Sequence, residues 1–455
     1  MINPSIFKAY DIRGVYDADF NDDFAYQLGL AYCQLRREEL GRDNFNIVAA
    51  HDMRLSSPIL YKELIRGLID GGANVVDVGL LATPSFYFAV AHYKYDGGII
   101  VSASHNPAAY NGFKLVRQMA APIGESSGIN DLKNLILAGG LSAHHTKGEL
   151  TKKENILVDQ VKYDLAYVNV ADIKPLKIVI DTANAMGALY LDELIKHLPQ
   201  LSIEKMNWNL DGTFPVHEAD PYKLENVKQL GEKIVELKAS LGVATDGDSD
   251  RIFFLDEMGQ AIEPGITRAI LCRLFLIDKP QSTIAYDIRP GRITYDTIIA
   301  NGGQPLVTRV GHSLIKEAVI DNGAYFAGES SGHFMLNMMN EGCYEVPGIV
   351  LLKLLVELSR ANLTFSEYVK PYQKYFHSGE INFKVNDTAE KIIELKEKYS
   401  SGKINELDGL SIEYNDYWFN VRASNTEPLL RLNLEAVSKE IMEVKRDEII
   451  QIINS

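Results

Sequence analysis

The chain has 455 residues, 46% of them apolar and 24% charged, which is typical of about three or four globular domains. Its 46 basic and 61 acidic residues give a net charge of −15, which argues against nucleic acid as the main partner. Three widely spaced cysteines without a Cys-x-x-Cys pair indicate neither a disulfide framework nor a zinc site. With no signal pattern and no apolar run of membrane-spanning length, we expect a cytoplasmic protein without a membrane partner.

Strand and helix units repeat along the chain. Three segments open with an apolar strand that ends in Asp and continue into a helix: 47–78, 177–197 and 283–310. In the first and third, an arginine (Arg54, Arg289) stands two positions after the Asp, and the helix stops at a glycine pair before a second strand. This pattern predicts three related α/β domains with mostly parallel sheets.

The C-terminal part follows another pattern. Past a helix expected over 349–359, we predict strands over 379–385, 411–414 and 418–422, helices over 389–399 and from Ser438, and so a smaller α+β domain. The polar segment 142–153 reads as the first linker. The predicted domains are 1–147, 148–252, 253–370 and 371–455.

The segment VSASHNPAAYNGFKL (101–115) places Ser104 in a polar turn after a short apolar strand over 98–101. A serine on a loop at the end of a buried strand is well placed to be a nucleophile or a phosphate carrier. A turn serine that hydrogen-bonds its own backbone is an equal alternative from this segment alone. His105 and Lys114 stand nearby in sequence.

The segment TDGDSDR alternates Asp246, Asp248 and Asp250 after an apolar run. Clustered carboxylates are costly without a cation, and oxygen ligands suit Mg²⁺ or Ca²⁺. An EF-hand loop begins in the same way but needs Gly at its sixth position, where Arg251 stands. A solvated acidic turn fits poorly between apolar strands. We therefore predict a site for Mg²⁺ in preference to Ca²⁺, with room for an oxygen of a phosphate on Ser104.

Three further segments carry polar groups suited to a ligand. Arg422, Ser424, Asn425 and Thr426 on one turn, with Arg431 beyond, suit an oxyanion, although such a turn can also cap its own backbone. In GESSGH, Glu329 and Ser331 are suited to vicinal hydroxyls, and His312 in GHS follows a repeat-unit strand. Together with Ser104 and the metal site, these groups favour phosphoryl transfer on a phosphorylated sugar or polyol.

Six ordered motifs over nearly the whole chain resemble those of the α-D-phosphohexomutases, most of all the bacterial phosphomannomutase/phosphoglucomutase branch. They are FKAYDIRG, SASHNPAAYNGFK, DGDSDR, GHSLIK, GESSGH and RASNTEP. The resemblance implies four domains around a central cleft. It also implies interconversion of hexose 6-phosphate and hexose 1-phosphate (mannose, glucose or both) through a hexose 1,6-bisphosphate, which would also serve as activator.

The same resemblance implies roles for particular residues. Ser104 is expected to be the phosphoserine and, with Asp246, Asp248 and Asp250, to bind Mg²⁺. Glu329 and Ser331 would bind the sugar hydroxyls, and the 422–426 turn the substrate phosphate. Other positions matching the lining of the family's cleft are Tyr10, Arg13, His105, Lys114, Arg251 and His312, of which Arg13, His105 and Lys114 are candidates for proton transfer. We also expect Arg289 and Arg431 to contact substrate.

Two departures from the family pattern bear on substrate preference. Relatives usually have an acidic pair before Gly-Ile where this chain has Tyr-Glu-Val-Pro at 344–347, and often Lys where Arg289 stands. Phosphoglucosamine or phosphopentose mutase activity is therefore the alternative, with a phosphate-ester hydrolase as a more distant one. The expected partner is a small phosphosugar, and the expected state is a monomer or a weak homo-oligomer.

Overall fold

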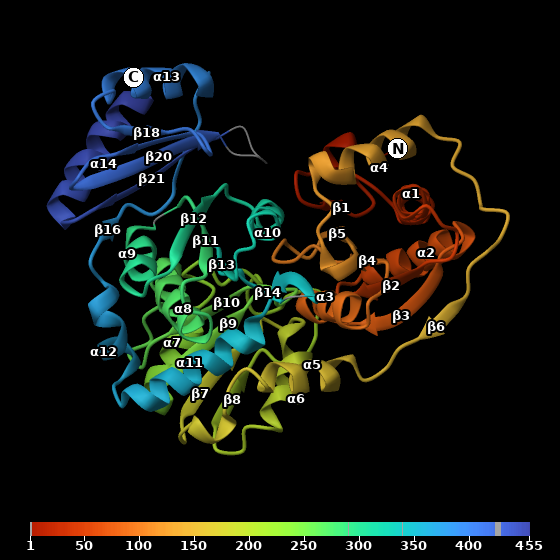
Figure 1. Ribbon diagram of the computed structural model, residues 1–455, viewed down its shortest axis with the longest axis horizontal. Coiled ribbons are helices and arrows are strands. Elements are labelled where there is room, and N and C mark those ends of the chain that lie inside the picture. Colours follow the sequence, from red (N-terminus) through yellow and green to blue (C-terminus); the bar gives the residue numbers. More distant parts are fainter. Residues whose placement is uncertain (1, 290, 339, 424–428) are drawn as a thin grey trace. The chain divides into compact units, whose positions relative to one another are not determined.

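The computed structural model describes residues 2–289, 291–338, 340–423 and 429–455 (Figure 1). The chain divides into two compact units, each described by itself below. The first comprises Met1–Ile262, Val319–Asp321 and Ser331–Tyr368, and the second Glu263–Ala318, Asn322–Ser330 and Val369–Ser455.

The first unit opens with a six-stranded mixed sheet in the order β1-β5-β4-β2-β3-β6. Its strands are β1 (Ile12–Val15), β2 (Asn46–His51), β3 (Asn74–Leu80), β4 (Gly97–Val101), β5 (Tyr110–Arg117) and β6 (Leu150–Lys152). The pairs β2–β4, β2–β3 and β3–β6 are parallel, whereas β5 runs antiparallel to β1 and β4. Parallel β2 and β4 end at the same edge of the sheet, which places the loop carrying Ser104 beside the segment that follows β2.

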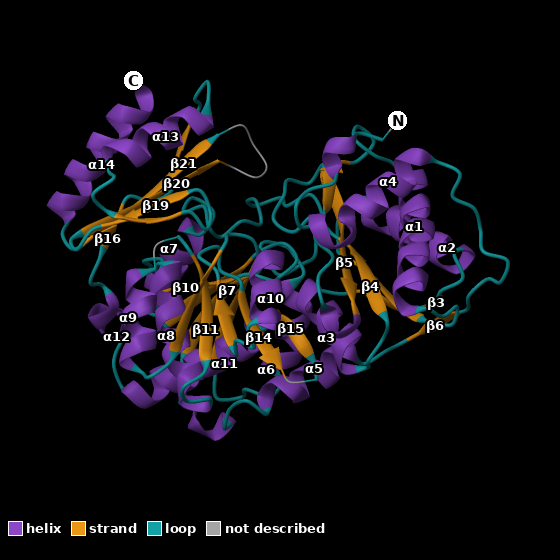
Figure 2. Cartoon of the chain, turned by 45° about the horizontal axis from the view of Figure 1, so that its top comes forward, coloured by secondary structure: helices purple, strands orange, loops and turns teal. Residues whose placement is uncertain are grey.

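Helices cover both faces of this sheet (Figures 1 and 2). They are α1 (Asp22–Leu40), α2 (Ser57–Asp70), α3 (Thr83–His92) and α4 (Asn130–Ala138). The first two and α4 share one apolar cluster with Ile47 and Ile99 of the sheet, whereas α3 contacts β2 and β4 without joining that cluster. Every residue of β4 is buried, as expected for a strand covered on both faces.

A second sheet of the first unit has the order β10-β9-β7-β8. It contains β7 (Lys177–Asp181), β8 (Ser202–Met206), β9 (Leu241–Thr245) and β10 (Ile252–Leu255), with helices α5 (Ile156–Leu165), α6 (Gly187–Ile195) and α7 (Lys228–Leu237). The hairpin β14 (Phe334–Met338) and β15 (Gly342–Glu345) and the helix α11 (Pro347–Ala361) also belong to this unit. The acidic segment lies in the turn between β9 and β10, which are antiparallel neighbours.

A buried carboxyl links three helices of this unit. Asp164 on α5 accepts a 2.6 Å hydrogen bond from Tyr190 on α6, and a Cβ on Gly348 of α11 would lie 1.9 Å from that Tyr190 hydroxyl oxygen. Burial raises the pKa of Asp164 to about 7, although the Tyr190 hydrogen bond opposes the shift. The folded protein therefore holds this carboxyl in its neutral form below neutral pH.

We expect Asp164→Asn to flatten the pH dependence of stability. The stabilisation from the neutral carboxyl is fully present below its unfolded pKa and is lost as pH rises through about 7. Relative to the variant, the wild type should lose about 2 kcal/mol of unfolding free energy between roughly pH 5 and pH 7. Denaturant titrations at several pH values measure this, with the half-exposed Asp192 on α6 (Asp192→Asn) as control. Parallel pH profiles for wild type and Asp164→Asn would contradict it.

The second unit contains the parallel strands β11 (Thr283–Asp287), β12 (Gln304–Thr308) and β13 (Phe326–Gly328), with β11 between the other two. Helices α8 (Pro264–Asp278), α9 (Arg292–Ala300) and most of α10 (His312–Asp321) accompany them. These three strands have the same chain order and pairing as β2, β3 and β4 of the first unit. In each set the first strand in the chain lies between the other two, β11 between β12 and β13 and β2 between β3 and β4.

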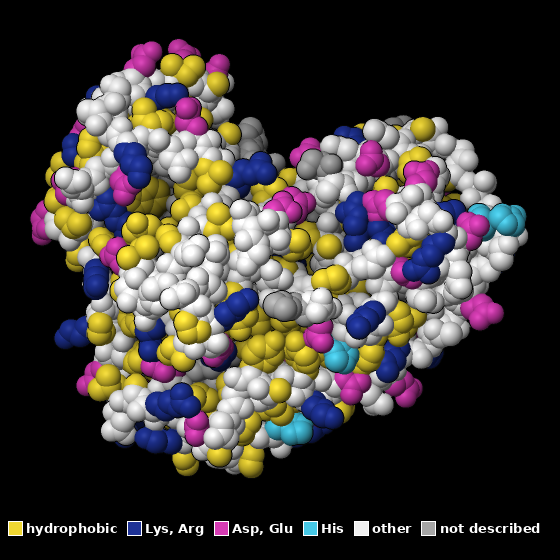
Figure 3. Space-filling view, viewed as in Figure 1, with side chains coloured by type: hydrophobic (Ala, Val, Ile, Leu, Met, Phe, Trp, Pro, Cys, Tyr) yellow, Lys and Arg dark blue, Asp and Glu magenta, His cyan; other side chains and the backbone are white. Residues whose placement is uncertain are grey.

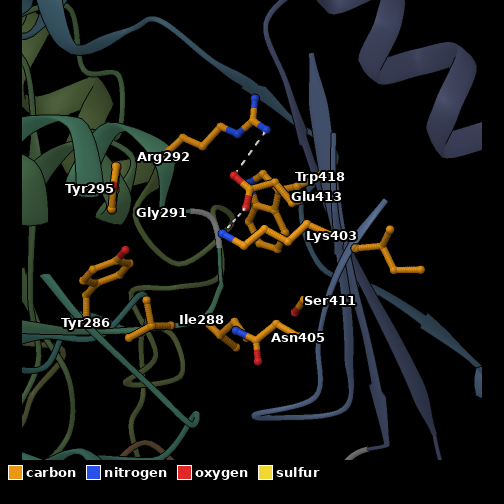
Figure 4. A pocket seen from close by; sticks show the side chains of 12 residues that line it. Tyr286, Ile288, Gly291, Arg292, Tyr295, Lys403, Asn405, Ser411, Glu413 and Trp418 are labelled. Carbon is orange, nitrogen blue, oxygen red and sulfur yellow. Dashed lines mark ion pairs between the residues drawn. The ribbon is translucent and has the colours of Figure 1, made fainter. Parts of the chain in front are cut away.

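The C-terminal sheet of the second unit is antiparallel, with β21 (Leu430–Ala436) paired to β16 (Phe376–His377), β17 (Ile381–Phe383) and β20 (Tyr417–Ala423). The strands β19 (Leu410–Glu413) and β18 (Lys403–Asn405) complete it, and α13 (Thr388–Lys398) and α14 (Lys439–Asn454) pack on it. Within this unit, a pocket of about 310 Å³ is lined by Tyr286, Arg292, Lys403, Glu413 and Trp418, among others (Figure 4).

Two expectations about chain organisation need correction. The polar segment 142–153 is more than a linker, because it ends in β6, which extends the first sheet alongside β3. The strand expected over 379–385 is shorter, at Ile381–Phe383. Within the ranges that the structure describes, no helix combines the length and apolar character needed to cross a membrane.

Candidate active site

Ser104 lies in the loop between β4 and β5, in an unusual backbone conformation. Its φ is +50°, in the left-handed region that costs a non-glycine residue about 1–2 kcal/mol. Ser104 is 3% exposed, and its Oγ donates a 2.8 Å hydrogen bond to Asp246 Oδ2. His105 Nδ1 lies 3.3 Å from Ser104 Oγ. The strained backbone of Ser104 and its buried hydroxyl, which is directed at a carboxylate, favour a phosphate carrier over an ordinary turn serine.

Arg54, which follows β2, holds this loop in place. Its fully buried guanidinium donates to four carbonyl oxygens, those of Ser104 (2.8 Å), Asn106 (2.6 Å), Pro107 (2.8 Å) and Tyr110 (3.0 Å). Asp52, 3.3 Å from Arg54 Nε, supplies the counter-charge. Arg54 therefore fixes the loop backbone at Ser104 and over the residues that follow it, as far as Tyr110.

We expect Arg54→Lys to lower kcat about 10- to 100-fold with little change in KM, since lysine keeps the charge but not the fork of donors. Arg66→Lys on the exposed face of α2, where Arg66 pairs with Glu63, serves as control and should leave kcat unchanged. Steady-state kinetics measure both, and a wild-type kcat in Arg54→Lys would show that the loop does not depend on this guanidinium.

The acidic triad forms a buried cluster next to Ser104. Asp246, Asp248 and Asp250 each present an oxygen within 4.8 Å of the others. Close approach of the two loops depends on Gly247, where a Cβ would lie 2.3 Å from the Ser104 carbonyl oxygen. Thr83, at the start of α3, donates a 2.6 Å hydrogen bond to Asp248 Oδ2.

Lys114 on β5 neutralises part of this charge. Its Nζ donates to Asp248 Oδ2 at 2.6 Å and to Asp250 Oδ2 at 2.5 Å. Burial alone would lower the pKa of Lys114, but these two carboxylates raise it well above its ordinary value. Burial, and then the charges of Asp250 and Asp248, raise the pKa of Asp246 well above its usual range. The three carboxylates of the triad thus carry more negative charge than Lys114 balances.

The donors fit a divalent cation. All are carboxylate oxygens, the hard ligands that Mg²⁺ prefers, and Asp248 Oδ1 is buried without a hydrogen-bond partner. The three carboxylates carry more negative charge than Lys114 offsets, and a divalent ion would offset the excess. The triad could therefore hold a metal ion, as the sequence predicts.

The end of the GESSGH segment meets the triad within the first unit. His333 Nε2 lies 3.1 Å from Asp250 Oδ1, and its Nδ1 lies 2.8 Å from Ser331 Oγ. Arg251 forms a backbone bridge with His333 and places its Nε 3.8 Å from Asp246 Oδ2. Glu345, in the segment where the chain departs from the family pattern, is fully buried and close to Asp250 and His333.

The other predicted residues of the first unit lie around the same loop. Arg13 Nη1 donates a 2.5 Å hydrogen bond to Asn106 Oδ1, and Arg13 also pairs with Asp11. Burial, followed by the nearby charges of Arg251 and Arg13, lowers the pKa of His105 well below its ordinary value. Tyr10 is half-buried in the segment before β1. The structure thus brings Arg13, His105 and Lys114 to the region of Ser104.

In the second unit, Arg289 and Glu329 form a pair. Arg289 Nη2 donates to Glu329 Oε1 at 3.0 Å, and Arg289 Nε donates to Asp287 Oδ2 at 2.5 Å. Gly311, next to His312, also donates to Glu329 Oε1. Like Arg54, Arg289 pairs with the Asp at the end of its own strand and reaches the loop after the neighbouring parallel strand. Both repeat units therefore hold a loop through an arginine that pairs with the aspartate at the end of the preceding strand.

Arg422 on β20 and Arg431 on β21 are directly opposite each other in the C-terminal sheet. Both contact Glu380, at 3.1 Å from Arg422 Nη2 and 3.3 Å from Arg431 Nη1. The predicted phosphate-binding residues Ser424, Asn425 and Thr426 lie outside the described residues.

Several site residues were not predicted from the sequence: Arg54, Thr83, His333, Asp287 and Glu380. His333 stands in the quoted GESSGH motif, and Arg54 and Asp287 stand in the quoted repeats, so both patterns contained a usable signal. Thr83 and Glu380 lie in no motif, and only the tertiary structure brings Thr83 to Asp248 and Glu380 to Arg422.

Comparisons with known proteins agree with the motifs. The four domain models of the phosphoglucomutase/phosphomannomutase family match residues 4–139 (domain I), 157–259 (domain II), 267–375 (domain III) and 380–452 (C-terminal domain). A phosphomannomutase of Escherichia coli is 35% identical over 464 aligned residues, which cover 100% of both chains. One of Methanocaldococcus jannaschii is 36% identical over 450 residues, covering 98% of this chain and 97% of the relative.

A crystal structure of a phosphoglucomutase/phosphomannomutase family protein from Burkholderia thailandensis has a TM-score of 0.89 at 31% identity, covering 99% of this chain and 97% of the other. The chain belongs to the phosphoglucomutase/phosphomannomutase family of α-D-phosphohexomutases and is a phosphohexomutase. The expected fold class, three α/β domains and a C-terminal domain, is confirmed.

Proposed function

We propose that Ser104 carries the phosphoryl group of this phosphohexomutase and exchanges it with a hexose phosphate. The observation that supports this most is the position of Ser104. Its backbone is strained, and its buried hydroxyl lies 2.8 Å from Asp246 of the acidic triad. In the first step the bond between phosphorus and Ser104 Oγ breaks, and a bond forms between phosphorus and the free sugar hydroxyl. The hydroxyl proton passes to a protein base. The resulting hexose 1,6-bisphosphate turns over and returns its other phosphate to Ser104, and the proton goes back to the departing sugar oxygen.

Asp246, Asp248 and Asp250, with an oxygen of the phosphoserine, would hold Mg²⁺, which when bound supplies positive charge to offset that of the transferring group. Lys114 holds two of the three carboxylates in place and adds a fixed positive charge. Of the three candidate bases, His105 lies at the Ser104 oxygen, whereas Lys114 and Arg13 are occupied by carboxylate or amide partners.

The substrate is proposed to be mannose phosphate, glucose phosphate or both, because the E. coli and M. jannaschii relatives are named phosphomannomutase. Glu329 and Ser331 would bind the sugar hydroxyls. The phosphate that is not being transferred would be bound by Arg422 and Arg431 together with Ser424, Asn425 and Thr426. We further propose that Tyr10, Arg251, Arg289 and His312 contact the substrate. The hexose 1,6-bisphosphate would serve as both intermediate and activator.

The test is turnover with mannose, glucose, glucosamine and ribose phosphates, following isomer exchange and free phosphate separately. The proposal predicts exchange of the 1- and 6-phosphates of mannose or glucose with no net phosphate release. Preferred turnover of glucosamine or ribose phosphate would assign the chain to the alternative mutases, and release of phosphate would indicate a hydrolase.

The cellular setting is also proposed. Cys33, Cys272 and Cys343 are all buried, and buried cysteines of this number and spacing suit a reducing cytoplasm. Basic and acidic side chains are interspersed on the face shown in Figure 3, in keeping with a small-molecule partner and not nucleic acid. We propose a monomer or a weak homo-oligomer, with oligomeric state measured by light scattering.

A further inference from the structure

A carboxylate already occupies the two arginines assigned to the substrate phosphate. Arg422 and Arg431 are cross-strand partners on β20 and β21, an arrangement in which like charges repel each other. Glu380 precedes β17, which pairs with β21, and its two oxygens are divided between the two guanidinium groups at 3.1 and 3.3 Å. Asn433 adds a 3.3 Å hydrogen bond to Glu380 Oε2.

The surroundings hold Glu380 in this position as an anion. Gly379, with φ of +69°, lies in the short irregular stretch between β16 and β17, which both pair with β21, and it directly precedes Glu380. Burial alone would raise the pKa of Glu380, but the charges of Arg289, Arg422 and Arg431 lower it below the ordinary value. Arg422 is almost fully buried, so its guanidinium cannot turn away into solvent.

We propose that Glu380 is a built-in anion that competes with the substrate phosphate for Arg422 and Arg431 and so keeps phosphate binding weak. This inference rests on the proposed function, in which Arg422 and Arg431 hold a phosphate. In that reaction each phosphate of the bisphosphate must bind this position and leave it again within one cycle. Tight binding of the ground state would lower KM and slow release without accelerating the transfer. Glu380 sets a lower affinity, because the phosphate must displace it.

The experiment compares Glu380→Gln with the wild type by calorimetric titration of inorganic phosphate and by steady-state kinetics. Glu380→Gln keeps the shape of the side chain but removes its charge. We expect phosphate to bind about tenfold more tightly, KM for hexose phosphate to fall and kcat to fall with it. Glu380→Asp, which keeps the charge, should stay near the wild-type affinity and covers the case in which the glutamine variant folds poorly.

Glu413→Gln is the matched control. Glu413 on β19 of the same sheet also pairs with two cations, Arg292 at 3.8 Å and Lys403 at 3.6 Å, in the separate pocket of Figure 4. Its substitution should leave phosphate affinity and KM unchanged. The same change in affinity in Glu413→Gln as in Glu380→Gln would show a general charge effect and overturn the inference.

Arg422→Gln separates this inference from the proposed function. If Arg422→Gln weakens phosphate binding while Glu380→Gln leaves it unchanged or weaker, Glu380 is only a structural counter-ion and the inference is wrong. If Arg422→Gln changes neither phosphate affinity nor KM, Arg422 does not hold the phosphate, and the proposed role of Arg422 and the inference are overturned together.

Discussion

Ser104→Ala is expected to lower mutase turnover at least about 1,000-fold, since no other residue takes the place of a covalent carrier. The variant removes only the hydroxyl and its 2.8 Å hydrogen bond to Asp246. Turnover is measured with saturating hexose phosphate and added hexose 1,6-bisphosphate. Intact mass should show one phosphoryl group on the wild type and none on the variant.

Ser102→Ala provides the control for this variant. Ser102 Oγ accepts a hydrogen bond from the Ser104 N–H, so the change touches the same loop but leaves the hydroxyl of Ser104 in place. We expect a loss of about tenfold or less. Turnover within tenfold of the wild type in Ser104→Ala, or an equal loss in both variants, would contradict the role given to Ser104.

Lys114→Met is expected to destabilise the fold by about 3–5 kcal/mol when metal is removed with chelator. The substitution leaves Asp248 and Asp250 buried without their shared cation, and breaking one partner of a buried ion pair has a cost of this size. Added Mg²⁺ should restore part of the loss, because an ion that binds only the folded state stabilises it. Urea unfolding with and without Mg²⁺ measures both effects.

Lys147→Met is the matched control, because Lys147 pairs with Asp70 but is largely exposed. Its stability should change little and should not depend on Mg²⁺. Equal stability losses in the two variants, or a Lys114→Met variant that gains no more from Mg²⁺ than the wild type does, would show that Lys114 does not share the charge of the triad with a metal.

The apolar strands that open the repeated segments could be predicted from sequence. The segments predicted to begin at 177 and 283 open with β7 and β11, each of which ends in Asp, and the segment predicted to begin at 47 opens with β2, which stops one residue before Asp52. A buried parallel strand requires such an apolar run, and the polar residue at its end marks the loop. In the smaller C-terminal domain, β21 was not predicted, although it is the strand that pairs with three others.

The part of the candidate site that lies within the sequence motifs could be predicted. Ser104, Lys114 and the triad lie together as their motifs imply, because β4, β5 and β9 deliver them to one place. Arg54 stands in the repeat pattern, which marks its position but not the carbonyl oxygens that it contacts. The role of Glu380 could not be predicted, since it depends on which distant arginines the fold brings close to its carboxylate.

As proposed above, Ser104 gives its phosphoryl group to a sugar and not to water. The most direct measurement labels the enzyme with radioactive hexose 1,6-bisphosphate, maps the label by peptide analysis and then adds unlabelled hexose 6-phosphate. We predict that the label resides on the peptide containing Ser104 and leaves it as sugar phosphate. Label on another residue would show that Ser104 is not the carrier, and label released as inorganic phosphate would show that the acceptor is water.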